Sequence, residues 1–236
     1  MSLSLSFRGV RKPYLTVLSR KRRYWAPRQI LLQEKIRVGS RIKRVKRGVR
    51  IEEVTVEIAS DSANDLRGTS EDLANWLLTD SVEELIFDDE KNRKYMAIVD
   101  GSFEPDEIVS HGYGVVKFLV PESAKRGASK SLNLSTTSAN HTITGQTETP
   151  WTVEVTFTES ANRFELWAGD IYLQLNYSFI EGDKLVIEYT GRKVTLNGND
   201  LRKAVSMSCH FEEMKPGIVS VRASHTAVLK YDERYY

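Results

Sequence analysis

Hydrophobic and polar residues alternate along most of this chain, and such alternation is the pattern of β-strands with one buried face. In the first half it is clearest over residues 3–7, 49–58, 95–99 and 114–120. The apolar positions of these segments hold mainly β-branched, leucine or aromatic side chains, which suit a sheet. The pattern therefore predicts a mainly β protein.

One segment departs from this alternation. Leu66, Leu73, Trp76 and Leu77 recur at helical spacing. Residues 61–65 just before them supply Asp, Ser and Asn, which favour a helix N-cap. The spacing predicts an amphipathic helix that lies across a sheet, with Trp76 in the core rather than in a ligand site.

Residues 121–131 combine Pro, Gly, small polar residues and charge, as domain boundaries often do. We expect an N-terminal domain over residues 1–123, a linker over 124–131 and a C-terminal domain over 132–236. Short strands separated by turn residues favour a β-sandwich or jelly roll for the second domain. Its strands are expected at residues 132–134, 142–144, 151–158, 163–167, 171–175, 184–189, 193–196, 207–211 and 218–230.

The charge is divided between two adjacent stretches. Residues 1–50 contain sixteen Lys and Arg against one acid, whereas residues 51–107 contain seventeen acids against four basic residues. Like charges crowded on one surface cost free energy. The basic stretch should therefore meet the acidic one, within a chain or between copies, or it should meet a nucleic acid.

The basic residues are densest over residues 37–48, a segment with Gly near each end and basic side chains on both faces of any strand it forms. Such a segment cannot fill a core. It predicts a protruding hairpin or extended loop that reaches solvent or a partner. The candidate contact residues are Arg37, Arg41, Lys43, Arg44, Lys46 and Arg47.

The sequence carries no P-loop, Gly-x-Ser-x-Gly or Gly-x-Gly-x-x-Gly motif. Its four histidines are far apart, and Cys209 is its single cysteine, so we expect no internal disulfide, metal or other cofactor. Residues 88–90 are three adjacent acids that could hold a cation, but the spacing of a calcium loop is missing and a solvated turn is favoured. No apolar run is long enough to span a membrane. We expect no enzymatic activity.

Several motifs in the first half resemble the distal tail protein (Dit) family of long-tailed, non-contractile bacteriophages (siphophages). They follow the expected order over residues 7–121, and the resemblance is weaker beyond them, where it rests on a hairpin at residues 194–198 and the closing strand. The matching residues are Phe7, residues 9–18, Arg22, Arg23, Trp25, Ala26, Pro27, Glu71, Asp72, Leu73, Ala74, Trp76, Leu77, residues 85–90, Arg93, Tyr95, Ala97, Val99, Asp100, Gly101 and residues 106–109.

The resemblance implies a fold and a role. The fold would be an N-terminal β-sandwich domain with one α-helix and a protruding β-hairpin, followed by a galectin-like or carbohydrate-module-like jelly roll. Six copies would form a ring, the baseplate hub, in which the hairpin of each copy embraces the next. The ring would join the tail tube protein to a tail-associated (Tal-like) tip protein and could dock receptor-binding or baseplate proteins. DNA would pass through only as cargo, and the protein would be made in the host bacterial cytoplasm and kept in the virion.

A basic hairpin that reaches an acidic surface of the next copy would explain the divided charge, because such head-to-tail contacts close into a ring when the rotation allows. The candidate acidic residues are Glu52, Glu53, Asp88, Asp89, Glu104, Asp106 and Glu107.

Two other functions remain open from the sequence. The basic residues, with Tyr14, Tyr24 and Trp25 among them, could grip a nucleic acid. Alternatively, the second domain could be a carbohydrate-binding module. Its candidate saccharide or partner-docking residues are Trp151, Trp167, Tyr172 and Tyr177, although alternating aromatic residues in a sandwich usually form the core.

Overall fold

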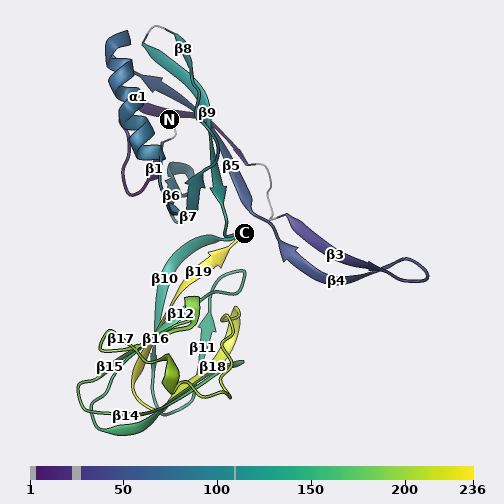
Figure 1. Ribbon diagram of the computed structural model, residues 1–236, viewed down its shortest axis with the longest axis vertical. Coiled ribbons are helices and arrows are strands. Elements are labelled where there is room, and N and C mark those ends of the chain that lie inside the picture. The colour runs from purple at the N-terminus through teal and green to yellow at the C-terminus, as the bar shows by residue number, and fades with distance from the viewer. Residues whose placement is uncertain (1–3, 23–27, 109) are drawn as a thin grey trace. The chain divides into compact units, whose positions relative to one another are not determined.

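The computed structural model describes residues 4–22, 28–108 and 110–236. The chain divides into two compact units, residues 1–126 with Tyr236 and residues 127–235. Strands dominate both units, and the described residues contain one α-helix (Figure 1), so the predicted mainly β fold class is confirmed. The expected linker at 124–131 is not a loop, because strand β10 (Lys125–Leu134) takes up nearly all of it. None of the helices that the described residues form is long and apolar enough to cross a membrane.

An antiparallel sheet of seven strands organises the first unit. Its order is β1-β6-β7-β9-β5-β2. Strand β8 pairs with residues 111–113 of β9, on the edge where β7 pairs with residues 118 and 119. In β5 the buried side chains alternate with half-buried ones, as the period of a strand requires. The strands are β1 (Leu5–Phe7), β2 (Leu15–Arg22), β5 (Arg50–Ala59), β6 (Glu83–Phe87), β7 (Tyr95–Val99), β8 (Asp106–Ile108) and β9 (His111–Val120).

The predicted helix is α1 (Ala63–Leu77), and it covers the core of this sheet. Ser62 is its N-cap: the hydroxyl oxygen accepts a hydrogen bond from the backbone N–H of Asp65. Trp76 is 6% exposed, its Nε1 donates to the carbonyl oxygen of Phe7 at 3.0 Å, and the two rings meet edge to face. The expectation that Trp76 belongs to the core is confirmed.

A buried arginine links β2 to the acidic residues of the sheet. The side chain of Arg20 is 4% exposed and lies over the Phe87 ring, with 3.5 Å from Cζ to the ring centroid. It donates to Glu52 at 3.1 Å, to Asp89 at 3.0 Å and to the Tyr95 hydroxyl at 2.6 Å. Burial raises the pKa of Tyr95, which keeps this hydroxyl protonated at neutral pH. The network places paired charged groups next to the apolar core of the first unit.

Part of the divided charge is neutralised within the chain. Arg11 makes two hydrogen bonds to Asp88, at 2.9 and 2.6 Å, and Lys12 makes two to Asp72, at 2.8 and 2.6 Å. Together with Arg20, these residues tie the basic start of the chain to the acidic stretch that follows. The three adjacent acids at residues 88–90 form a short 3-10 helix. Asp88 and Asp89 make ion pairs with Arg11 and Arg20, and Glu90 accepts a hydrogen bond from Lys125.

These ion pairs make the stability of the first unit depend on pH. Hydrogen bonds from Arg11 lower the pKa of Asp88, and hydrogen bonds from Lys12 and Tyr14 lower the pKa of Asp72. Because both folded pKa values lie below the unfolded ones, the contribution is complete above about pH 4 and is lost as the pH falls through the folded values. We expect Asp88→Asn to lower the melting temperature at pH 6 and to have a smaller effect at pH 2.5, measured by circular dichroism. An equal effect at both pH values would contradict this.

The second unit is a β-sandwich. One sheet has the order β10-β19-β12-β15-β16-β17 and the other the order β11-β18-β13-β14, and buried residues of both sheets form a single core. Phe157 and Phe179 stack within it, with 4.2 Å between ring centroids. The remaining strands are β11 (Ala139–Ile143), β12 (Trp151–Thr156), β13 (Ala161–Ala168), β14 (Ile171–Phe179), β15 (Lys184–Glu188), β16 (Lys193–Leu196), β17 (Asn199–Asp200), β18 (Gly217–Ala223) and β19 (Ala227–Tyr235).

Two of the strands predicted for this unit differ from the structure. Residues 207–211 form no strand, and His210 makes only an isolated bridge to Tyr172. The single strand expected over 218–230 is two strands, β18 and β19, separated by residues 224–226. The lone Cys209 is half-buried against the core, where its Sγ accepts from the backbone N–H of Gln174.

Candidate assembly interface

The basic segment belongs to a two-stranded antiparallel ribbon, β3 (Gln29–Lys35) and β4 (Ser40–Arg47), visible in Figure 1. The strands are joined by residues 36–39, where Gly39 has φ +90°, a conformation that favours glycine. A hairpin was predicted, but its expected bounds of 37–48 were wrong, since they cover only the turn and β4. The six predicted basic residues therefore lie on the turn and on one strand.

A β-bulge sorts the apolar side chains of this hairpin. Leu31 pairs with Val45 and Gln33 pairs with Ile42, although Val45 and Ile42 are three residues apart. Lys43 is the extra residue of the bulge, because it lies between Arg44 and Ile42 and has no partner in the register. The bulge therefore places the side chains of Val45 and Ile42 on the same face as Leu31. The other side chains of that face are polar or basic.

The opposite face also combines apolar and charged side chains. Leu32 pairs with Arg44, and Glu34 pairs with Arg41. Lys43 makes a salt bridge to Glu34 at 3.0 Å. Residues 29–47 hold seven Lys and Arg and a single acid, so the hairpin as a whole is strongly basic.

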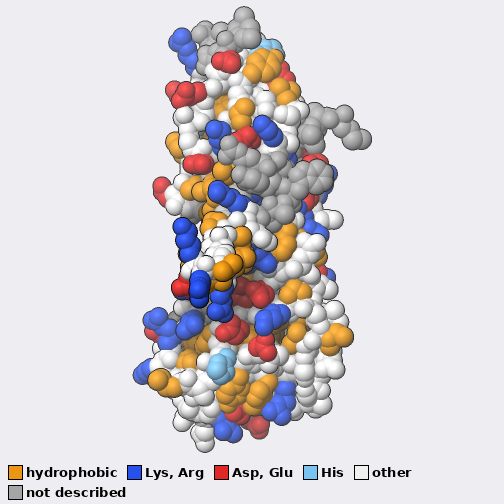
Figure 2. All heavy atoms as spheres, turned by 90° about the vertical axis from the view of Figure 1, so that its right-hand side faces the viewer, with side chains coloured by type: hydrophobic (Ala, Val, Ile, Leu, Met, Phe, Trp, Pro, Cys, Tyr) orange, Lys and Arg blue, Asp and Glu red, His pale blue; other side chains and the backbone are white. Residues whose placement is uncertain are grey.

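Every described residue of both hairpin strands is solvent-exposed. Aliphatic side chains contribute part of that surface. Figure 2 shows hydrophobic side chains in orange and basic side chains in blue near one another on the face that it presents. A two-stranded hairpin without further packing is only marginally stable in water, and clustered exposed apolar residues mark interaction sites. The exposed aliphatic residues are Ile30, Leu31, Leu32, Ile36, Val38, Ile42, Val45 and, just beyond β4, Val49. These features make the hairpin the candidate interface.

The predicted acidic face is only partly exposed. Glu52 was wrongly placed on it: this residue is fully buried in β5, beside Arg20 and Arg50. Asp88 and Asp89 are held by arginines of the same chain, and Glu53 is half-buried in β5. The side chain of Glu107 lies outside what the structure describes.

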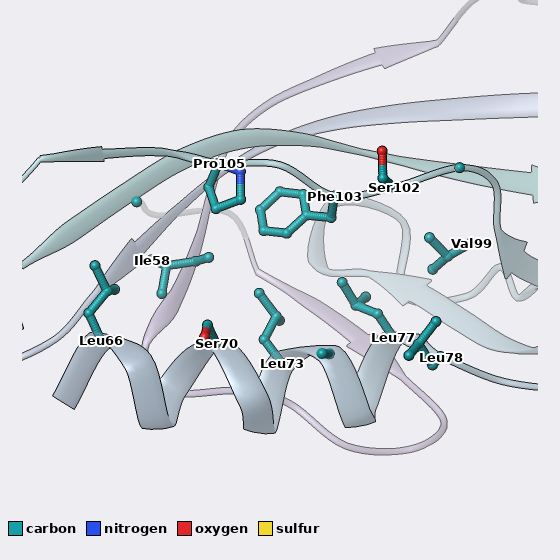
Figure 3. Close-up of a pocket in the computed structure, with 13 residues that line it drawn as sticks. Ile58, Leu66, Ser70, Leu73, Leu77, Leu78, Val99, Ser102, Phe103 and Pro105 are labelled. Carbon is teal, nitrogen blue, oxygen red and sulfur yellow. The ribbon is translucent and has the colours of Figure 1, made fainter. Parts of the chain in front are cut away.

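Glu104 and Asp106 are exposed, and no basic partner for either occurs in the part of the chain that the structure describes. Both flank an apolar pocket that sequence reasoning missed. The pocket lies between α1 and residues 99–105 and has a volume of about 230 Å³ (Figure 3). No sequence signal marks it, because its two walls are distant in the chain.

The four candidate aromatic residues do not form one platform. Trp151 is wrongly included, because it is 2% exposed in the core and its Nε1 donates to the carbonyl oxygen of Glu212. Trp167 and Tyr172 do lie together, with ring centroids 5.7 Å apart, and the Arg222 guanidinium covers the Trp167 ring at 3.9 Å. Tyr177 is 39% exposed and packs on Phe179.

The nucleic-acid hypothesis loses much of its basis in the structure. Arg11, Lys12 and Arg20 are occupied by acids of the same chain. Tyr14 donates its hydroxyl hydrogen to Asp72, and Tyr24 and Trp25 lie outside the described residues. Among the described residues, no group of three or more His, Cys, Asp or Glu is placed to hold a metal ion.

The chain thus consists of a mainly β unit that bears an exposed hairpin and a second unit that is a β-sandwich. Family models agree over most of the chain: residues 14–120 match the phage tail protein RIFT-related domain, and residues 144–235 match the C-terminal domain of the siphovirus-type tail component. The chain belongs to the distal tail protein (Dit) family.

Individual relatives point the same way. The distal tail protein of Bacillus phage SPP1 is 28% identical over 177 residues, which is 72% of this chain and 70% of that protein. The crystal structure of SPP1 Dit superposes with a TM-score of 0.88 at 19% identity, covering all of both chains. A chain of the phage P2 baseplate in its activated conformation with Ca shares the fold, with a TM-score of 0.58 at 7% identity over 98% of this chain and 97% of that one. The relatives are tail and baseplate components, so this is a structural family and its place is the virion.

Proposed function

We propose that six copies of this chain form a closed ring, the hub at the distal end of a siphophage tail. The observation that carries the proposal is the β3–β4 hairpin, in which every residue of both strands is solvent-exposed and basic side chains are combined with aliphatic ones. A hairpin of this kind is suited to a partner that supplies acidic and apolar groups. The Dit family assignment indicates that a further copy is one such partner.

Head-to-tail contacts explain how one hairpin per chain can build a closed object. Each copy offers its hairpin to the next and receives one from the previous copy, so the two contacting surfaces differ and can close around an axis. The described hairpin has a charge opposite to that of Glu104 and Asp106, which gives the contact a direction. One type of contact, repeated from copy to copy, can therefore close the ring.

We further propose that the ring joins the tail tube protein to a Tal-like tip protein, and that the second unit serves as a docking platform for receptor-binding or baseplate proteins. The likeness to a baseplate component supports this role. DNA would pass through the ring without being bound specifically. The internal pairing of Arg11, Lys12 and Arg20 supports that view, because it reduces the basic surface open to phosphates.

Light scattering of the purified chain over a range of concentrations tests the assembly state. We expect a species of six times 26.9 kDa that dissociates as salt is raised, since exposed charge pairs are screened within about 10 Å at 0.1 M ionic strength. A chain that stays monomeric at every concentration, both alone and mixed with its tail tube protein, would contradict the proposal.

A further inference from the structure

The apolar pocket of the first unit lies between α1 and residues 99–105 and has mainly apolar walls. In Figure 3, Leu66, Leu73 and Leu77 rise from α1 toward Phe103 and Pro105 on the other wall. Its volume of about 230 Å³ exceeds the roughly 150 Å³ of an apolar cavity that accommodates benzene. One or two aliphatic side chains would fit in it.

The mouth of the pocket is exposed to solvent. Leu78, which follows the last turn of α1, is 74% exposed although it lines the pocket. Ser70 also lines it and is exposed on the helix surface. An apolar opening of this kind is normally covered in an assembled protein, because its burial removes apolar surface from water.

Several exposed acidic residues are next in sequence to residues that line this opening. Glu71, Asp100, Glu104 and Asp106 are each adjacent in sequence to a residue that lines the pocket, and all four are exposed. Among the described residues, Arg67 is the one Lys or Arg that is adjacent in sequence to a residue lining the pocket. A partner for this pocket should therefore present an aliphatic side chain surrounded by positive charge.

The turn of the β3–β4 hairpin has that composition. Val38 is 86% exposed and Ile36 is 52% exposed. Lys35, Arg37 and Arg41 are their close neighbours in sequence. The turn is narrow because the backbone N–H of Ile36 donates to the carbonyl oxygen of Gly39. It is therefore a compact apolar tip inside a basic collar.

We propose that the hairpin turn of one copy inserts Val38 into the pocket between α1 and residues 99–105 of the next copy. This inference rests on the proposed function, in which hairpins link successive copies, and it names the acceptor surface. Lys35, Arg37 and Arg41 of the entering hairpin face Glu104, Asp106 and the other acids around the pocket. The contact thus pairs apolar with apolar and basic with acidic groups.

Directed disulfide formation tests the contact. Two forms of the full chain, both carrying Cys209→Ser, are mixed: one has Val38→Cys and an affinity tag, and the other has Ser70→Cys. Because a disulfide requires Cα atoms about 4.4–6.8 Å apart, mild oxidation should join a tagged to an untagged chain in high yield. The control partner carries Asn75→Cys, which is exposed on the same helix but does not line the pocket. We expect its yield to be at least tenfold lower. Equal yields from the two partners would overturn the proposal.

An occluding substitution gives a second measurement. Ser70→Trp should fill the opening and weaken association at least tenfold, whereas Asn75→Trp on the same helix should leave it unchanged. Circular dichroism shows whether both variants are folded. Equal association of the two folded variants would count against the pocket.

The outcomes distinguish failure of the pocket proposal from failure of the proposed ring. If chains assemble into six-membered rings without the Val38–Ser70 cross-link, the hairpin docks elsewhere and the pocket proposal fails alone. If the cross-link forms but continues into open chains of more than six copies, the pocket is the acceptor and the closed hexamer fails.

Discussion

Replacing Arg41 and Arg44 by Glu is expected to leave the chain folded but to prevent ring formation at concentrations where the wild type assembles. Both arginines lie on the exposed strand β4, opposite Glu34 and Leu32, so the first unit does not depend on them for its core. The change alters the hairpin charge by four units in each copy. Like charges that face each other across an interface cost several kcal/mol, so each contact should weaken by tenfold or more. Light scattering measures the mass.

The matched control reverses two exposed lysines of the second unit, Lys184 and Lys203, and changes the net charge by the same amount. This control should assemble like the wild type, which separates an effect of the hairpin from a general effect of charge. Raising the salt concentration should weaken wild-type assembly but change the hairpin variant little. A hairpin variant with the mass of the wild type would show that these arginines do not contact another copy.

The second large effect concerns stability. Arg20→Met should lower the free energy of unfolding of the first unit by about 3–5 kcal/mol, because it leaves Glu52 buried without its closest cation. Glu52 is fully buried, and its other cationic neighbour, Arg50, is 3.7 Å away. Urea unfolding followed by tryptophan fluorescence measures the change, in a background in which Trp151 and Trp167 of the second unit are replaced by Phe so that the signal comes from the first unit.

Two further variants make this test specific. Adding Glu52→Gln to Arg20→Met removes the buried charge and should restore part of the lost stability. Arg11→Met, which breaks an exposed ion pair, should have a much smaller effect than Arg20→Met. If the two single variants were equally destabilised, the Arg20 network would not stabilise the core as described.

The parts of the fold that were predicted correctly are those with strong local periodicity. The apolar spacing from Leu66 to Leu77 indicates a helix whatever surrounds it, and the structure confirms it. Alternation also contained information that the site prediction ignored. Counting back by two from Val54 places Glu52 on the buried face of β5, and Trp151 shares its face with the buried Val153. Both errors follow from choosing residues by type instead of by strand position.

Other features could not be read from the sequence. The first hairpin strand contains Ile30, Leu31 and Leu32 in succession, so it shows no alternation that would mark an exposed strand. Its pairing and bulge are properties of two strands together. The pocket depends on the packing of α1 against residues 99–105, which are separated by β6 and β7 in the chain. Local pattern does not determine such a contact.

The central claim is that exposed hairpins link copies of this chain into a hub ring. Electron microscopy of the purified protein, with two-dimensional averaging of single particles, tests it most directly. The account predicts six-fold averages with a central opening for the wild type and their loss in the Arg41→Glu/Arg44→Glu variant. Averages without six-fold symmetry, or identical rings from the wild type and that variant, would contradict it.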